Sequence, residues 1–180
     1  MTDSPTRRSA DAGARRSAAA ARERSAARLA AVQALYQIEM TGAPSGDVLR
    51  EFLNLRLGED VDGLDLAHAD RRLLDDLVTG VTAQHDELDD LLAAVLDEDW
   101  PVERLETLVR LVLRSGAYEL AERRKTPVRV ILAEYVGLAD AFFSGKEPGL
   151  VNGVLDRLAR SLRPEEFETE PPRGPDRSGP

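Results

Sequence analysis

Paired arginines near the start of the chain have the type and spacing needed to bind phosphate groups. Arg24 and Arg28 are four residues apart, so on a helix they lie one turn from each other. A guanidinium group binds phosphate oxygens through parallel hydrogen bonds, which suits arginine to contacts with a nucleic-acid backbone. Because both residues precede the first large apolar residue, Leu29, we expect them on a helical end that projects into solvent.

The same arginines also fit a simpler interpretation, a solvated helix start. Basic residues are unfavourable near a helix N-terminus, because that end already carries partial positive charge. This unfavourable placement argues against an accidental cluster, but charge alone leaves both interpretations open.

A second candidate for anion binding is the connection Ser144-Gly145-Lys146-Glu147-Pro148-Gly149. A helix is predicted directly after it, from Leu150 to Leu162, and the first backbone N–H groups of a helix can bind an anion. Lys146 adds a positive charge at the same place. Sequence chemistry alone favours the alternative, an ordinary connector between two helices.

No group of residues predicts catalysis or a bound cofactor. The chain has no cysteine, and its two histidines, His68 and His85, lack the spacing of metal ligands. A Gly-rich phosphate loop after a strand and a GxSxG motif are both absent from the sequence. We therefore expect a protein that is not an enzyme and that uses no cofactor or metal.

Arg110 and Arg114 repeat the four-residue spacing within an apolar stretch. A buried arginine without a partner is strongly destabilising. We therefore expect Arg114 to form a structural ion pair, with Glu134 as the candidate partner.

Charge is distributed unevenly along the chain. The net charge is −9, yet residues 1–28 hold seven arginines against three acidic residues and carry +4, which leaves −13 on the remainder. A basic segment on an acidic body confines nucleic-acid contact to one region. The absence of cysteine, of a secretory signal and of a long apolar run favours a cytoplasmic location.

The composition predicts an all-α fold, because 42% of the residues are hydrophobic and only 4% are aromatic. Periodicity gives about seven helices and no strand, with helices over residues 18–40, 47–57, 66–95 and 150–162 and others beginning near 102 and 127. Thr126 is the expected N-cap of the helix that begins at Pro127. The buried stripe of the first helix is predicted to comprise Leu29, Val32, Tyr36 and Met40.

Three small residues, the single tryptophan and the composition of the two ends of the chain lead to further predictions. Ser115-Gly116-Ala117 lies within a helical run and predicts close packing of another helix, and the lone Trp100 is expected to pack under a turn. We divide the chain into a basic disordered arm (1–20), one helical domain (21–163) and an acidic, proline-rich disordered tail (164–180).

Three motifs in the helical domain resemble the bacterial NusB family of transcription antitermination factors. They are Arg24 and Arg28 followed by LAAVQALY (29–36), LRSGAYEL (113–120) and VNGVLD (151–156). The AVQALY and VNGVLD blocks are specific, and the resemblance covers about residues 20–163.

The resemblance implies an all-helical fold of two three-helix bundles with a short additional helix. It also implies binding to the boxA element of ribosomal RNA leader transcripts, as a heterodimer with the small-subunit ribosomal protein called NusE. This pair joins an RNA polymerase complex that resists premature termination. Some similar proteins form homodimers through the face that otherwise holds RNA.

The resemblance implies RNA contact by arginines of the arm and first helix and by residues around the VNG motif. These residues are Arg15, Arg16, Arg22, Arg24, Arg28, Lys146, Gly149, Leu150 and Asn152. Leu150 stands where relatives commonly have an aromatic residue, so we expect weaker contact with a base there, because leucine cannot stack as a ring does. Lys146 replaces an acidic residue of some members and should favour phosphate.

The residues implied to contact NusE are Tyr36, Val109 and Arg110. Val109 stands at a position that is acidic in the family, so one salt bridge to NusE is expected to be missing.

Two other functions compete with this interpretation. A helical adaptor whose basic arm is only a tail would not bind RNA with or without a partner. Similar helical domains also precede RNA cytosine methyltransferases, but such an enzyme needs a further doubly wound domain and usually a catalytic cysteine. This sequence has no cysteine and stops at Pro180, so we do not expect methyltransferase activity in it.

Overall fold

The computed structural model describes residues 5–56, 60–61, 64–65, 68–97 and 101–168. Its elements are α1 (Pro5–Thr41), α2 (Ser45–Glu51), the π-helical turn η1 (Phe52–Arg56), β1 (Asp60–Val61), β2 (Leu64–Asp65), α3 (Arg71–Ala83), α4 (His85–Ala93), the 3₁₀ turn η3 (Val102–Arg104), α5 (Thr107–Glu122), α6 (Val128–Phe142), α7 (Glu147–Leu162) and the 3₁₀ turn η4 (Pro164–Glu166). The predicted all-α class is confirmed, with seven α-helices in the described part of the chain. The expectation of no strand is wrong at one place, since β1 and β2 form a two-residue antiparallel pair.

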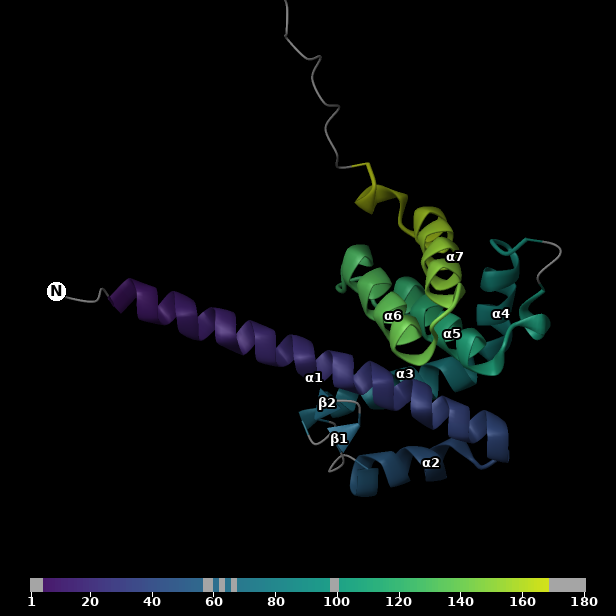
Figure 1. Ribbon diagram of the computed structural model, residues 1–180, viewed down its shortest axis with the longest axis horizontal. Helices are drawn as coiled ribbons and strands as arrows, with labels where there is room; N and C mark the ends of the chain where they lie inside the picture. The colour runs from purple at the N-terminus through teal and green to yellow at the C-terminus, as the bar shows by residue number, and fades with distance from the viewer. Residues whose placement is uncertain (1–4, 57–59, 62–63, 66–67, 98–100, 169–180) are drawn as a thin grey trace, which may run out of the picture.

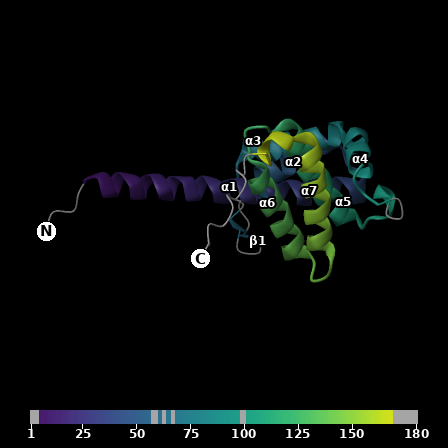
Figure 2. The same cartoon turned by 90° about the horizontal axis from the view of Figure 1, so that it is seen from above.

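The helices form two bundles, and the long helix α1 of the first also packs against α5 of the second. Helices α1, α2 and α3 pack together, α5, α6 and α7 form the second bundle, and α4 packs on α5 and α7. The C-terminal half of α1 lies in the body, whereas its N-terminal half extends away from every other helix (Figures 1 and 2). This is the predicted arrangement of two three-helix bundles with one additional helix.

Helix α1 is enclosed from several sides where it passes between the bundles. Its buried residues are Ala26, Ala27, Arg28, Leu29, Ala30, Ala31, Val32, Ala34 and Leu35. Their largely small side chains let α3 and α5 approach the helix closely. The predicted stripe is therefore right for Leu29 and Val32 but wrong for Tyr36 and Met40, which are 39% and 60% exposed. Which residues of α1 are buried depends on the helices that lie next to them. The buried residues therefore do not form one periodic stripe.

Several predicted element boundaries differ from the structure. Helix α1 begins at Pro5, so the segment expected as a disordered arm is helical from that residue, in line with the strong helix propensity of its alanines and arginines. The predicted third helix is divided at Gln84, whose backbone leaves helical geometry (φ −111°, ψ 24°), and α4 thereby turns towards α5 and α7.

The start of α6 is capped by a residue far along the chain. Thr126 was the expected N-cap, but the helix starts at Val128 and no side-chain cap comes from the residue before it. Instead, the backbone N–H of Val128 donates to Glu166 Oε2 (2.9 Å). An acidic side chain at a helix N-terminus serves the same electrostatic purpose as a local cap.

Close helix packing at the predicted small residues is confirmed. A Cβ atom on Gly116 would lie 2.7 Å from Cδ1 of Leu155, so α5 and α7 can meet only because the side chain is absent. Gly80 has the same role in α3, since a Cβ there would lie 2.2 Å from the ring of Tyr118.

The end of the helical domain is held by a buried arginine. Arg163 is fully buried and donates to the carbonyl oxygens of Leu120 (2.7 Å), Glu119 (2.9 Å) and Thr126 (2.8 Å), which lie at and after the end of α5. Residues expected to begin a disordered tail instead form η4, and Arg160 stacks on the ring of Phe167 at 4.4 Å. Trp100 and residues 169–180 lie outside the described residues.

None of the helices in the described ranges combines the length and apolar character that a membrane span requires.

Candidate nucleic-acid interface

The projecting half of α1 carries the first group of predicted RNA contacts. Arg15, Arg16 and Arg22 are exposed, and Arg24 is half-buried where the helix enters the body. The segment contains alanine, serine and arginine but no large apolar residue before Leu29, so it has no hydrophobic face to bury. It therefore stays in solvent as a basic helix (Figure 1).

Arg28 does not project into solvent, and this expectation is wrong. Its side chain is 1% exposed. Its Nε donates to Glu119 Oε2 (2.6 Å), its Nη2 donates to Glu119 Oε1 (3.1 Å), and its Nη1 lies 3.3 Å from Glu134 Oε2. Burial by itself would lower the pKa of Arg28, but the hydrogen bonds and charge of Glu119 outweigh it and raise that pKa. The guanidinium group is fully engaged within the protein, so Arg28 is a structural residue.

The carboxylate of Glu119 is the centre of a buried network that the sequence analysis missed. Glu119 is fully buried, accepts a hydrogen bond from the Tyr135 hydroxyl (3.0 Å) and lies 3.6 Å from Nε of Arg123. Burial, followed by the charge of Glu119, raises the pKa of Tyr135 well above its ordinary value. Nearby, the Ser25 hydroxyl donates to Glu134 Oε1 (2.9 Å).

This network joins α1 to α5 and α6, and it lies at the point where the basic half of α1 leaves the body. Two cations and two carboxylates balance each other in it, so it fixes the helix without adding net charge. Arg28 and Ser25 thus fasten α1 to α5 and α6 at this point. One signal for this network is present in the sequence: Arg28 is a charged residue among alanines, and a buried arginine there needs a carboxylate partner.

The predicted ion pair of Arg114 is confirmed, but the predicted partner is wrong. Arg114 donates from Nε and Nη2 to the two carboxylate oxygens of Asp89 (2.7 and 2.6 Å), and its Nη1 lies 3.9 Å from Glu39. These hydrogen bonds to Asp89 raise the pKa of Arg114. Glu134 is held by Arg28 instead, because α6 packs on the opposite side of α5 from α4.

The second group of predicted RNA contacts lies at the start of α7. The helix begins at Glu147, not at Leu150, so the N–H of Leu150 donates to the carbonyl oxygen of Lys146 (3.0 Å) and cannot bind an anion. Lys146 is exposed at the N-cap, and Gly149 and Asn152 are exposed on the first turns of the helix. The predicted anion-binding connection is therefore shorter than expected, and its positive group is the Lys146 side chain.

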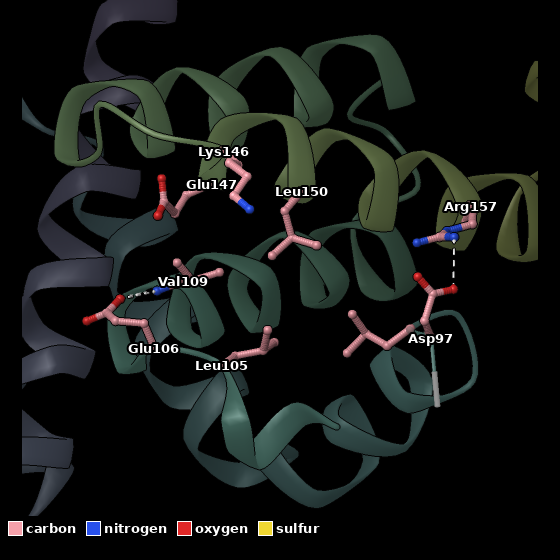
Figure 3. A pocket seen from close by; sticks show the side chains of 9 residues that line it. Asp97, Leu105, Glu106, Val109, Lys146, Glu147, Leu150 and Arg157 are labelled. Atoms are coloured by element: carbon pink, nitrogen blue, oxygen red, sulfur yellow. Dashed lines mark hydrogen bonds and ion pairs between the residues drawn. The ribbon is translucent and has the colours of Figure 1, made fainter. Parts of the chain in front are cut away.

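Leu150 faces a cleft of about 270 Å³ between the start of α7, the start of α5 and the end of α4 (Figure 3). The cleft is lined by Leu96, Asp97, Leu105, Glu106, Val109, Lys146, Glu147, Leu150 and Arg157. Its floor is apolar, with Lys146 at one end and Arg157 near Asp97 at the other. Three carboxylates, those of Asp97, Glu106 and Glu147, also line the cleft, and Asp97 lies 3.9 Å from Arg157. The apolar floor can cover an unstacked nucleobase, and Lys146 is the lining cation that remains for a phosphate.

The residues expected to contact a protein partner are not all on one surface. Tyr36 is exposed on α1, next to the more exposed Met40, which the sequence analysis had assigned to the core. Val109 is 2% exposed and lines the cleft with Leu150. Arg110 donates from Nη2 to Glu39 Oε1 (2.8 Å). Glu39 lies on the same part of α1 as Tyr36 and Met40.

Comparisons with known proteins find relatives over most of the chain. The NusB family profile matches residues 25–160. The transcription antitermination protein NusB of Rhodopseudomonas palustris (strain BisB18) is 45% identical over 141 residues, which cover 78% of this chain and 83% of that protein. The protein of the same name from Sinorhizobium fredii (strain NBRC 101917 / NGR234) is 47% identical over 139 residues, covering 77% of this chain and 87% of the relative.

Comparison with solved structures also finds NusB proteins. T. maritima NusB aligns with a TM-score of 0.65 and 28% identity over 79% of this chain and 94% of its own. A structure of the antitermination factors NusB and NusE in complex with dsRNA aligns with a TM-score of 0.64 and 26% identity over 78% of this chain and 98% of that chain. By the extent of the sequence match and by its fold, this chain belongs to the NusB family.

Proposed function

We propose that this protein is a transcription antitermination factor. It binds the boxA RNA of ribosomal RNA leader transcripts together with a NusE-type ribosomal protein and supports processive transcription of ribosomal RNA. The observation that carries this proposal is a NusB fold whose first helix projects an exposed basic end, while the body is strongly acidic. Relatives are named transcription antitermination proteins, and a similar structure is of NusB with NusE and dsRNA.

The projecting half of α1 supplies the contacts with the RNA backbone. We assign these contacts to Arg15, Arg16, Arg22 and Arg24, which are accessible, and not to Arg28. Neutralising phosphates releases counterions, so this part of the affinity falls as salt rises.

The cleft beside α7 supplies the contacts with bases. We assign a phosphate contact to Lys146, and the apolar side chains of Leu150 and Leu105 can cover an unstacked base. Gly149 and Asn152 are accessible on the same helix and extend this surface. Base contact here is apolar coverage without ring stacking.

The NusE-type partner is assigned to the surface around Tyr36 and Met40. These are the two large hydrophobic side chains that are exposed in the described part of the chain. The acidic body attracts a basic ribosomal protein and speeds its association. Arg110 bounds this surface from α5 through its contact with Glu39, whereas Val109 is buried beside the cleft at α7 and is left out of the partner surface. The complex joins RNA polymerase in the cytoplasm. No catalytic step is part of the proposal.

Fluorescence anisotropy of a labelled boxA RNA tests the proposal, with the protein alone and with an equimolar NusE-type protein at two salt concentrations. We expect weak binding alone, tighter binding with the partner, and a preference for boxA over a scrambled RNA of equal length. The absence of binding under both conditions would leave the helical adaptor as the better explanation.

A matched pair of variants assigns the affinity to the basic helix. Arg22→Ala with Arg24→Ala should lower the slope of log Kd against log salt by about 1.4, because each phosphate contact with a single strand contributes about 0.7. Arg50→Ala with Arg124→Ala removes the same charge from exposed sites on α2 and after α5 and should leave the slope unchanged.

A further inference from the structure

Four residues follow one another along the face of α7 that borders the cleft. Lys146 is the N-cap, and Leu150, Gly153 and Arg157 come four, seven and eleven residues later, so all four lie within about 60° of each other around the helix. Lys146, Leu150 and Arg157 line the cleft in this order from one end towards the other (Figure 3). The helix therefore presents a cation, an apolar side chain, a position without a side chain and a second cation.

Gly153 leaves the helix surface open between Leu150 and Arg157. A Cβ atom at this position would meet nothing within 4 Å. Leu150 and Arg157 are seven residues apart, which corresponds to about 10 Å along the helix axis. Each face of a flat nucleobase contacts a side chain at about 3.5 Å, so a base inserted here has room to touch both side chains.

The guanidinium group of Arg157 is only loosely held by its neighbour. The side chain is 50% exposed, and its Nη1 lies 3.9 Å from Oδ1 of Asp97, which is longer than a hydrogen bond. A carboxylate binds a guanidinium group through the N–H groups at its edge, and this leaves the two flat faces for stacking. Asp97 thus keeps Arg157 at the cleft without using the surface on which a base stacks.

The other two carboxylates of the cleft lie away from Arg157. Figure 3 places those of Glu106 and Glu147 at the opposite end of the cleft. Glu106 is also engaged, because its Oε2 accepts a hydrogen bond from a backbone N–H group at the start of α5 (3.0 Å). Asp97 lies at the Arg157 end, where the arginine compensates its charge. The part of the cleft between Leu150 and Arg157 is therefore apolar and close to neutral, which suits a base better than a phosphate.

We propose that Arg157 stacks its guanidinium plane on the unpaired RNA base that Leu150 covers, with the base inserted across Gly153. The inference rests on the proposed function and deepens it, because it adds a stacking contact to the apolar coverage at Leu150. Stacking of this kind depends on the flat shape of the guanidinium group and not on its charge alone. Every base has a flat face, so the contact holds one nucleotide in place whatever its identity.

Substitution by lysine separates the plane of Arg157 from its charge. Arg157→Lys keeps the positive charge but removes the flat group, so it should weaken the binding of labelled boxA RNA about tenfold, within the range that one stacked base contributes. The slope of log Kd against log salt should keep its native value, because no phosphate contact is lost. Arg160→Lys is the matched control: this exposed arginine lies three residues later on α7 and does not line the cleft, so the variant should bind like the native protein.

RNAs that each lack a single base locate the stacked nucleotide. With the native protein, one abasic position should lower the affinity about tenfold, whereas with Arg157→Lys the same RNA should bind with a much smaller further loss. Gly153→Leu fills the gap and should cause its loss at the same nucleotide. Gly137→Leu, at an equally open glycine on α6, should bind like the native protein. Circular dichroism and thermal unfolding check that all variants fold.

Three results would overturn the inference. Native RNA affinity in Arg157→Lys, together with a lower salt slope in Arg157→Ala, would make Arg157 a charge contact. Equal losses at every abasic position in the native protein and in Arg157→Lys would place the base elsewhere. Weaker binding of the NusE-type protein by Arg157→Lys in calorimetry, with unchanged RNA affinity, would assign the cleft to that partner. The proposed function fails by a different result, equal affinity of the native protein for boxA and scrambled RNA.

Discussion

Arg28 shows how one residue can look like an RNA contact and act as a structural support. Its guanidinium group is enclosed with Glu119 and fastens the first helix to the second bundle. Removing one member of a buried ion pair leaves an uncompensated charge, which destabilises a protein by about 3–5 kcal/mol. We expect a loss of this size for Arg28→Met in the free energy of unfolding, measured by urea denaturation.

The control for Arg28 lies one turn earlier on the same helix. Arg24 is half-buried at the surface, so Arg24→Ala should change the free energy of unfolding by no more than about 0.5 kcal/mol. If the two substitutions proved equally mild, the network around Glu119 would not hold α1 in place.

Tyr118 gives a second prediction at the scale of the residue, in the dependence of stability on pH. Burial, together with the hydrogen bond that its hydroxyl donates to Asp76 (3.0 Å), raises the pKa of Tyr118 to about 12. In the unfolded chain a tyrosine has a pKa of about 10. The folded protein thus keeps a proton that the unfolded chain loses, so this contribution is complete below about pH 10 and is lost as pH rises towards about 12.

Denaturation of the native protein and of Tyr118→Phe over this range measures the contribution. The native protein should lose stability more steeply with rising pH than the variant, which has no phenol to titrate at this position. Parallel pH profiles would show that the Tyr118 proton does not contribute to stability.

At the scale of the element, glycines decide how closely the helices approach. Gly80 lies in α3, where alanine is the better helix former by about 1 kcal/mol. A Cβ atom at this position would lie 2.2 Å from the Tyr118 ring, and such overpacking destabilises by about 1–3 kcal/mol. We expect Gly80→Ala to lower the melting temperature.

Gly137 is the matched control for this prediction. It is also in a helix, but a Cβ atom there meets open space, so Gly137→Ala should stabilise the protein by about 0.4–1 kcal/mol. Calorimetry of the two variants should therefore give shifts of opposite sign. Shifts of the same sign would mean that α3 and α5 adjust freely to the added methyl group.

At the scale of the whole molecule, charge and apolar surface are separated in space. The basic end of α1 projects from an acidic body, and the exposed Tyr36 and Met40 lie at the opposite end of the same helix. This arrangement lets RNA and a basic protein bind at once to different parts of one long helix. The acidic body also limits nonspecific contact with nucleic acid to the arginine-bearing end.

The partner surface can be tested without disturbing the core. Met40 is 60% exposed, so Met40→Glu should leave the free energy of unfolding within about 0.5 kcal/mol of the native value. If Met40 is a hot spot of the interface, charging it costs about 2 kcal/mol or more in binding. Isothermal titration with the NusE-type protein should show that loss, and unchanged affinity would place the partner elsewhere.

The sequence by itself determined the all-α class, the stretches that form helices, the close helix contact at Gly116 and the family to which the chain belongs. These features depend on residues near one another in the chain, since periodicity, propensity and short motifs are local. The exposure of the basic end of α1 could also be predicted from local sequence, because a segment without large apolar side chains has no face to bury.

Only the tertiary structure decided which charges are buried and with whom they pair. Arg28 meets Glu119 across 91 positions of sequence, and Arg114 pairs with Asp89 and not with the predicted Glu134. The break at Gln84 and the exposure of Met40 likewise depend on where distant helices lie. The sequence around a charged or apolar side chain is the same whether that side chain becomes buried or stays exposed. Which of the two happens depends on the distant helix that packs against it, and so on the tertiary structure.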